Sequence, residues 1–348
     1  MTRTLKNRTT RCSFPSRNPY ADLTPLKSTL VSHHVSVDSK ALTGSLSHLE
    51  STLTQKWGGR GPIAMAAPPH PLQMQRPAES PFFRVLGVRV DAVQIDDVVE
   101  QMEEWIRKRR GCHSIAATGM NGIVEAQHDP KFQKILNATD LIVPDGMPLV
   151  WLGRRRGHNL PRRVYGPDLL LAFCEKTAGR GYRHFFYGAE RDPDVAKRLA
   201  KKIEQRFPGT IVAGTYSQRA NAEQDNGDDT VSLISRAAPD VLWVGLGELR
   251  QVRWMHEHRN KLNVPVVVGV GAAFDMISGR RRQAPRWMRE HGLECLFRLL
   301  QEPRRLWRRY LIYGTEFVTR IVLASMGLTN SRQTRMTLNS SRTHFPKS

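Results

Sequence analysis

The chain has 348 residues, with 53 Lys and Arg against 32 Asp and Glu, which gives a formal net charge of +21. This length allows about two domains, and 40% hydrophobic residues with seven Trp exclude a wholly disordered chain. The four cysteines form no CxxC pair, which argues against a disulfide framework or a zinc ribbon and fits a reducing compartment. The chain contains no run of about 18 apolar residues, so no membrane span is predicted. The charge favours anionic partners, namely phosphates, nucleic acid or an acidic membrane surface.

The two ends of the chain lack a sustained period. Residues 1–80 are basic and rich in Ser, Thr and Pro, and we predict a disordered tail there. No apolar stretch follows the basic start, so a secretory signal is not expected. Residues 327–348 are predicted to form a second disordered tail. Between the tails we predict a folded domain over residues 81–280 and a helical appendage over residues 281–326.

Strand-like and helix-like segments alternate in the folded domain. The expected strands cover residues 85–93, 113–118, 141–143, 184–187, 210–215, 241–244 and 264–270. The expected helices cover residues 96–109, 122–137, a short segment around 149–152, 168–177, 192–207, 230–237 and 251–260. Near-continuous apolar strands that alternate with amphipathic helices are typical of a sheet covered on both faces. The pattern predicts a doubly wound α/β domain with a mostly parallel sheet.

The segment that follows this domain is basic and amphipathic. From Arg280 to Arg309 there are ten arginines against three glutamates, and Trp, Leu and Phe recur at helical spacing. Such a segment suits a membrane interface or the phosphates of a ligand. Two other interpretations are open. The segment could be an ordinary helix with a solvated basic face, or it could bind RNA or DNA, although no RNA-binding signature accompanies it.

Three expected strands end in glycine turns, at residues 186–189, 244–247 and 270–273. Ligands of open α/β sheets bind beyond the carboxyl ends of the strands, where glycine admits a ligand to the backbone and helix N-termini favour anions. Gly247 and Gly271 are therefore candidate binding residues. The chain contains neither GxGxxG nor a P-loop sequence, so the fingerprints of those nucleotide sites are missing.

Asp145 is the candidate catalytic residue. It follows Val143 and Pro144, just past a buried strand and before a helix, so its carboxylate is expected at the ligand edge of the sheet. A carboxylate in that place can act as a general base toward a hydroxyl. A purely structural role as a turn or cap residue is the alternative.

Six other polar side chains lie at comparable positions near strand ends and helix starts: Thr118, Asn121, Arg163, Asp168, Gln251 and Asp275. Thr118 and Asn121 can hydrogen-bond to a sugar, and Asp275 to a base or ribose. The structural alternatives are helix capping by Asn121 and an ion pair between Arg163 and Asp168. No metal site is expected, because the chain has no HExxH motif and no other ligand cluster with usable spacing.

Several runs of the sequence together resemble the WecG/TagA/CpsF family of bacterial glycosyltransferases. They are residues 138–146, 163–168, 240–247 with Gln251, 269–275 with Gly279, 284–287, 292–294 with Arg298, and 302–304. The runs stand in the order and spacing of the family and cover about residues 83–318.

The resemblance implies a Rossmann-like α/β fold and an inverting transferase. Such proteins move a sugar, typically N-acetylmannosamine, from a UDP donor to a lipid-linked acceptor, typically N-acetylglucosamine on undecaprenyl diphosphate. Neither a metal nor another cofactor is generally required. The family's proposed base falls on Asp145, its strand-end threonine on Thr118, and its helix-start glutamine on Gln251.

The resemblance also implies an arginine-rich C-terminal appendage that closes the site and touches the membrane. Without a metal, arginines and helix N-termini must stabilise the charge on the leaving UDP. The candidates are Arg163, Arg298, Arg304 and Arg305. We therefore expect a cytoplasmic protein that lies peripherally on the inner face of the cytoplasmic membrane and binds its anionic surface. No nucleic-acid partner is expected, and a homo-oligomer is left open.

Four positions depart from the family pattern. Asn121 stands one residue later than usual, Leu249 replaces a proline, Val252 a glutamate, and Cys295 a tryptophan. These changes leave open a different donor sugar or a non-catalytic member of the family.

Overall fold

The computed structural model describes residues 80–188, 192, 194–217 and 228–328, without the side chains of Arg286, Glu290 and Arg305. The tails predicted over residues 1–79 and 329–348 lie outside the described residues.

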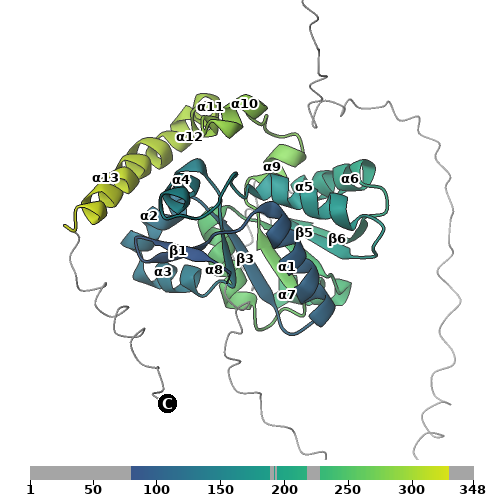
Figure 1. The fold of residues 1–348 in the computed structure, drawn as a ribbon. Helices are drawn as coiled ribbons and strands as arrows, with labels where there is room; N and C mark the ends of the chain where they lie inside the picture. Colours follow the sequence, from purple (N-terminus) through teal and green to yellow (C-terminus); the bar gives the residue numbers. More distant parts are fainter. Residues whose placement is uncertain (1–79, 189–191, 193, 218–227, 329–348) are drawn as a thin grey trace, which may run out of the picture. The chain divides into compact units, whose positions relative to one another are not determined.

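The central sheet has six strands, all parallel, in the order β4-β3-β8-β7-β5-β6 (Figure 1). Their bounds are β3 His113–Thr118, β4 Leu141–Pro144, β5 Arg183–Gly188, β6 Ile211–Ser217, β7 Val241–Gly245 and β8 Val266–Gly269. The strands β4, β7 and β8 are buried at every position, as expected for strands covered on both faces. The predicted doubly wound α/β fold is confirmed.

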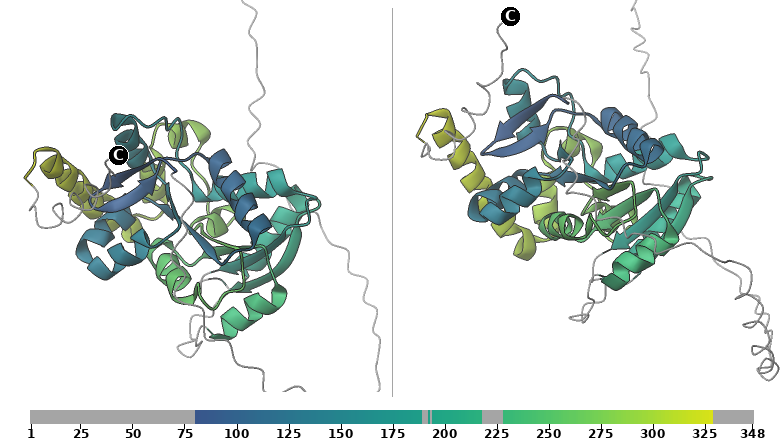
Figure 2. Two further views of the ribbon diagram at one scale, coloured as in Figure 1. Left: turned by 60° about the horizontal axis from the view of Figure 1, so that its bottom comes forward. Right: turned by 90° about the horizontal axis from the view of Figure 1, so that it is seen from below.

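Helices cover both sides of the sheet, as Figure 2 shows. One face carries α2 Met120–His128, α3 Pro130–Asn137, α7 Asp228–Ala237 and α8 Glu248–His258, packed on Leu242 and Val244. The other face carries α1 Ile95–Lys108, α5 Gly166–Thr177, α6 Val195–Arg206 and the short α9 Ala273–Ile277. There the Trp243 ring meets the Phe173 ring edge-on, with centroids 5.8 Å apart. Alternate residues of β7 thus pack into the hydrophobic cores on the two faces of the sheet.

The prediction of a single strand at the start of the domain is wrong. Residues 85–93 do not make one strand of the main sheet. Instead β1 Phe82–Val85 and β2 Val88–Asp91 pair antiparallel in a sheet of their own. The turn uses Leu86 and Gly87, with φ of 48° and 80°. Two positive φ values are typical of the tight turns that join hairpin strands, but leucine seldom adopts one, so the turn had no sequence signal.

The helix expected over residues 122–137 is also wrong, because the chain forms two helices there. The break falls at Asp129, whose side chain accepts a hydrogen bond from the Lys131 N–H at 2.9 Å and caps α3. Pro130 has no N–H with which to continue α2, and it starts α3 instead.

Residues 286–328, which we call the C-terminal segment, are a chain of short helices that leaves the sheet domain and returns to it (Figure 1). They are α10 Arg286–Glu290, α11 Glu294–Gln301, α12 Pro303–Trp307, a π-helical turn η1 Arg308–Ile312 and α13 Tyr313–Ser325. Helix α13 packs against α2 and buries Phe317 in the core. His128 of α2 also pairs with Glu316 of α13 at 2.7 Å.

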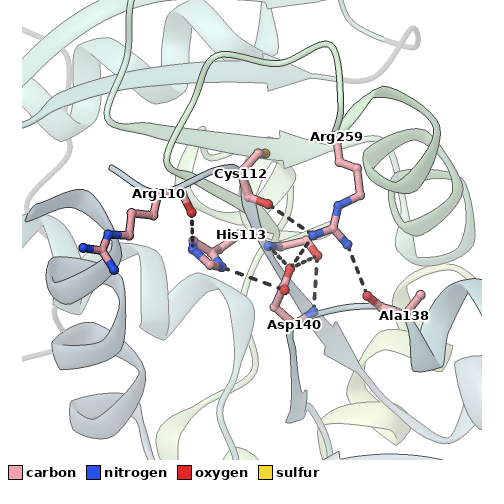
Figure 3. A network of polar contacts seen from close by, with 7 residues as sticks. Arg110, Cys112, His113, Ala138, Asp140 and Arg259 are labelled. Atoms are coloured by element: carbon pink, nitrogen blue, oxygen red, sulfur yellow. Dashed lines mark hydrogen bonds and ion pairs between the residues drawn. The ribbon is translucent and has the colours of Figure 1, made fainter. Parts of the chain in front are cut away.

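A buried polar network joins the amino ends of β3 and β4 (Figure 3). Asp140 accepts hydrogen bonds from the N–H and hydroxyl of Ser114, at 2.8 and 2.9 Å, and lies 3.3 Å from the Arg259 guanidinium. Burial opposes the charge, yet His113, Arg259 and Ser114 hold the pKa of Asp140 below its ordinary value. The network fixes the sheet at the end opposite to its carboxyl edge.

Candidate active site

A cleft of about 570 Å³ opens at the carboxyl ends of β3, β4, β7 and β8. This is the edge at which open α/β sheets bind ligands, and the volume suits a molecule of nucleotide size. The C-terminal segment supplies part of the wall. The polar and glycine residues on which the argument depends are Gly119, Asn121, Asp145, Arg163, Tyr165, Gly247, Glu248, Gln251, Gly271, Asp275, Glu294, Arg298, Arg309 and Tyr310.

Asp145 lies in this cleft, directly after β4. Within the described part of the chain, no hydrogen bond or ion pair holds its carboxylate. Burial raises the pKa of Asp145 to about 7, Glu248 and Glu294 add to the rise, and Arg163 and Arg298 oppose it. A carboxylate with this pKa is about half ionised near neutral pH, and its ionised form combines high basicity with a substantial population, which suits a general base.

The turn that presents Asp145 depends on glycine. Gly146, the N-cap of α4 Met147–Arg155, has φ 149° and ψ 144°, a backbone conformation that residues other than glycine rarely adopt. The Asp145 N–H donates to the Thr118 carbonyl at 2.9 Å, which ties this turn to the end of β3. Asp145 is thus carried on a turn fixed by two neighbouring strands.

A buried ionic cluster stands on one side of Asp145. Arg163 forms an ion pair with Glu294 of α11, and the Tyr165 hydroxyl donates to the same carboxylate. The Arg163 guanidinium also lies over the Tyr165 ring, 4.1 Å from its centroid. Arg163 therefore pairs with Glu294 rather than with Asp168, and this cluster fastens the C-terminal segment to the sheet domain.

Gln251 is buried at 1% exposure, and its Oε1 accepts the Gly271 N–H at 2.9 Å. Gly247 and Gly271 have φ of 93° and 45°. The sequence predicted that Gly247, Gln251 and Gly271 lie at a ligand site, and all three line the cleft. Gln251 joins the turn after β7 to the turn after β8, so its side chain shapes the wall through the backbone that it holds.

The C-terminal segment contributes Arg298, Arg309 and Tyr310 to the cleft. Among the described residues, the Arg298 side chain has no hydrogen bond or ion pair, although Tyr310, Tyr165, Glu294 and Asp145 outweigh its burial and raise its pKa. Its guanidinium is available to a ligand. Arg304 is exposed and does not line the cleft. The predicted role of Arg305 concerns a side chain outside the described ones.

Of four other predicted residues, Asp275 and Asn121 line the cleft, whereas Asp168 and Thr118 do not. Asp275 lines the cleft and pairs with Arg280 at 3.2 Å and Arg281 at 3.3 Å. Asp168 lies outside the cleft lining and pairs with Arg289 at 3.4 Å. Thr118 is buried, and its hydroxyl has no hydrogen-bond partner among the described residues. Asn121 lines the cleft from within α2, whose N-cap is Gly119, so capping by Asn121 does not occur.

Sequence reasoning missed Glu248. This residue begins α8, and its side chain crosses the cleft wall to three groups of the β3–α2 turn and to Arg309. Its partners lie 61 to 129 residues away in the chain. No local pattern contains such contacts, so the sequence carried no signal for them.

The chain was compared with known proteins. Residues 83–331 match the profile of the family described as Glycosyl transferase WecG/TagA/CpsF family. The chain belongs to this family. It is a glycosyltransferase.

Similar proteins carry one name, N-acetylglucosaminyldiphosphoundecaprenol N-acetyl-beta-D-mannosaminyltransferase. The one from Bacillus spizizenii is 31% identical over 207 residues, which is 60% of this chain and 77% of the relative. The one from Bacillus subtilis is 32% identical over 183 residues, 53% of this chain and 69% of the relative. The one from Staphylococcus aureus strain MW2 is 26% identical over 227 residues, 64% and 86% of the two chains.

The described residues contain no group of three or more His, Cys, Asp or Glu side chains arranged to hold a metal ion. None of their helices has the length and apolar character that a membrane crossing requires. Of the departures from the family pattern, Cys295 lines the cleft, whereas Val252 is buried in the core.

Proposed function

We propose that this glycosyltransferase moves an N-acetylmannosamine-like sugar from a UDP donor to a sugar on undecaprenyl diphosphate. The acceptor is N-acetylglucosamine or a close analogue, and the product serves a surface or exopolysaccharide. The names of the relatives support both sugars and the lipid. The observation that carries the mechanism is Asp145, a cleft carboxylate with no hydrogen-bond or ion-pair partner among the described residues and a pKa of about 7.

The reaction is a single displacement with inversion. Asp145 takes the proton of the acceptor hydroxyl as that oxygen attacks the anomeric carbon, and the bond to the UDP oxygen breaks. A donor held in α linkage to UDP then gives a β-linked product, as the relatives' name specifies for them. The half-ionised state of Asp145 at neutral pH supports its role as the base.

Positive groups of the cleft stabilise the leaving diphosphate. Arg298 has no protein partner among the described residues, and Arg309 lies at the same wall. Two guanidinium groups at the wall of the cleft, one of them also paired with Glu248, can offset a developing negative charge and lower the barrier without a metal ion. We therefore propose that neither a metal nor another cofactor is needed.

The acceptor is a lipid, so we propose that the protein works peripherally on the inner face of the cytoplasmic membrane. Large apolar side chains of the C-terminal segment are exposed, among them Leu300 at 73%, Leu311 at 57% and Val318 at 59%. Arg304 and Arg308 are exposed in the same segment. Apolar side chains next to arginines favour an interface of anionic lipids.

We place the sugar of the acceptor in the cleft next to Trp151. This residue lines the cleft and is 52% exposed. A flat aromatic ring at a cleft mouth offers an apolar surface to the face of a sugar.

The experiment is a transfer assay with the full chain, a panel of UDP-sugars and a short-chain lipid-diphosphate N-acetylglucosamine acceptor, with and without EDTA. Acceptor-dependent UDP release that survives EDTA, together with the mass gain of one N-acetylhexosamine, is the expected result. Loss of turnover in EDTA would overturn the metal-free mechanism. Absence of turnover with every donor, while UDP still binds, would favour a non-catalytic member of the family.

A further inference from the structure

Glu248 is the first residue of α8, just beyond the carboxyl end of β7. Its side chain is 11% exposed. One oxygen, Oε1, accepts the backbone N–H of Gly119 at 3.0 Å and that of Gly122 at 3.1 Å. The other, Oε2, accepts from the side-chain amide of Asn121 at 3.2 Å.

Through these contacts, Glu248 of helix α8 caps the N-terminus of helix α2. Helix α2 begins at Met120, and its N-cap Gly119 has no side chain with which to satisfy the free N–H groups of the first turn. The Glu248 carboxylate fills that place, where negative charge is favoured. The β3–α2 turn is therefore held in its shape by a residue 126 to 129 positions away.

The same carboxylate holds the C-terminal segment. Arg309 of η1 forms an ion pair with Glu248 Oε2, and its side chain is 32% exposed at the wall of the cleft. One carboxylate thus joins the turn after β7, the turn after β3 and the C-terminal segment.

The turn that Glu248 fixes touches the turn that carries Asp145. A methyl group built on Gly119 would lie 2.8 Å from the Asp145 carbonyl oxygen, so the two backbones are in close contact. The Asp145 N–H also donates to the carbonyl of Thr118, the residue before Gly119. Movement of the β3–α2 turn would therefore move the base.

We propose that Glu248 is a positioning residue of the transfer reaction. It sets Asp145 through the β3–α2 turn and holds the C-terminal segment over the cleft through Arg309. This inference rests on the proposed function, in which Asp145 is the base.

The charge of Glu248 gives this role a second readout. Glu248 contributes to the raised pKa of Asp145. Arg163, Glu294 and Arg298 also act on the pKa of Asp145, and their charges stay when Glu248 is replaced. Arg309 keeps its charge as well and loses only its ion-pair partner. Because the kcat/KM of a general-base reaction rises with pH through the pKa of the base, loss of a neighbouring negative charge moves that midpoint to lower pH.

The test compares Glu248→Gln and Arg309→Gln with the parent chain in the transfer assay over pH 5.5–8.5. Glu257→Gln is the matched control, because Glu257 is an exposed acid near the other end of α8. Both test variants should lose about 10- to 100-fold in kcat/KM, the cost of a misplaced catalytic group. Only Glu248→Gln should also move the acid limb to lower pH, because Arg309→Gln leaves the Glu248 charge in place.

Thermal unfolding and UDP binding are measured on the same samples, so that a folding defect is recognised. If Glu248→Gln unfolds, Arg309→Gln still tests the hold on the C-terminal segment, and trypsin cleavage within residues 298–309 should become faster. Parent-like kcat/KM and pH profile in Glu248→Gln would overturn the proposal. An inactive parent chain would instead count against the proposed function, and the two failures are thereby distinct.

Discussion

Replacement of Asp145 by Asn tests the proposed base most directly. The side chain keeps its size and loses the ability to take a proton. General-base catalysis contributes about 10²- to 10⁴-fold, so kcat/KM should fall by that factor at pH 7.5. UDP binding should persist, because the change removes a negative charge from the cleft that is proposed to bind the diphosphate.

The raised pKa of Asp145 sets the expected pH dependence of the transfer reaction. With the pKa of Asp145 at about 7, the kcat/KM of the parent chain rises with pH and levels off above 7. About one tenth of the plateau should remain one unit below the midpoint, near pH 6. Asp145→Asn should give a flat profile. Asp229→Asn, at an exposed acid of α7, is the control and should behave as the parent.

As pH rises, the free energy of unfolding should fall while activity rises. A raised pKa means that the folded state favours the protonated carboxyl, so the stability contributed below pH 4 is lost as pH rises toward 7. A shift from 3.8 to about 7 corresponds to about 4 kcal/mol at most, and Asp145 is only partly buried, so Asp145→Asn should gain a part of this above pH 7. Urea unfolding at pH 5 and pH 8 measures it. An Asn variant with parent-like turnover, or a parent midpoint below pH 5, would refute the reasoning.

Three further replacements follow from the site. Arg298→Gln should lower kcat/KM about 10²- to 10³-fold through loss of a donor to the leaving diphosphate; unchanged kinetics would remove Arg298 from that role. Glu294→Gln should cost about 3 kcal/mol in urea unfolding, because Arg163 keeps a buried charge without its partner, and a parent-like midpoint would contradict this. Gly245→Ala should cost about 1–3 kcal/mol, since its new methyl carbon would lie 2.4 Å from Phe274 Cδ2; a loss below about 0.5 kcal/mol would mean that the ring moves aside.

The sequence could predict the sheet edge and the residues that stand on it. Buried strands followed by glycine or by Asp145 place those residues at one edge, because parallel strands all end on the same side. Gly247, Gly271 and Gln251 line the cleft for that reason. Asp168 does not, because it lies within the first turn of α5 and turns toward Arg289.

The contacts between distant segments could not be predicted. Glu248 and Glu294 look like ordinary acids at the starts of helices, and their partners lie 61 to 131 residues away in the chain. Arg298 and Arg304 carried equal weight in the sequence, yet the first lines the cleft and the second faces solvent. Only the path of the C-terminal segment separates them.

The packing of α13 on α2 has a consequence for distance. Helix α2 begins with the turn at the cleft wall, and α13 lies against it with Val318 and Val322 exposed. The thickness of α13, about 10 Å, therefore lies between an apolar outer surface and α2, whose first turn lines the cleft. If that surface rests on a bilayer, the acceptor extends its head group past α13 to the cleft, and its hydrocarbon chain can stay among the lipids throughout the reaction.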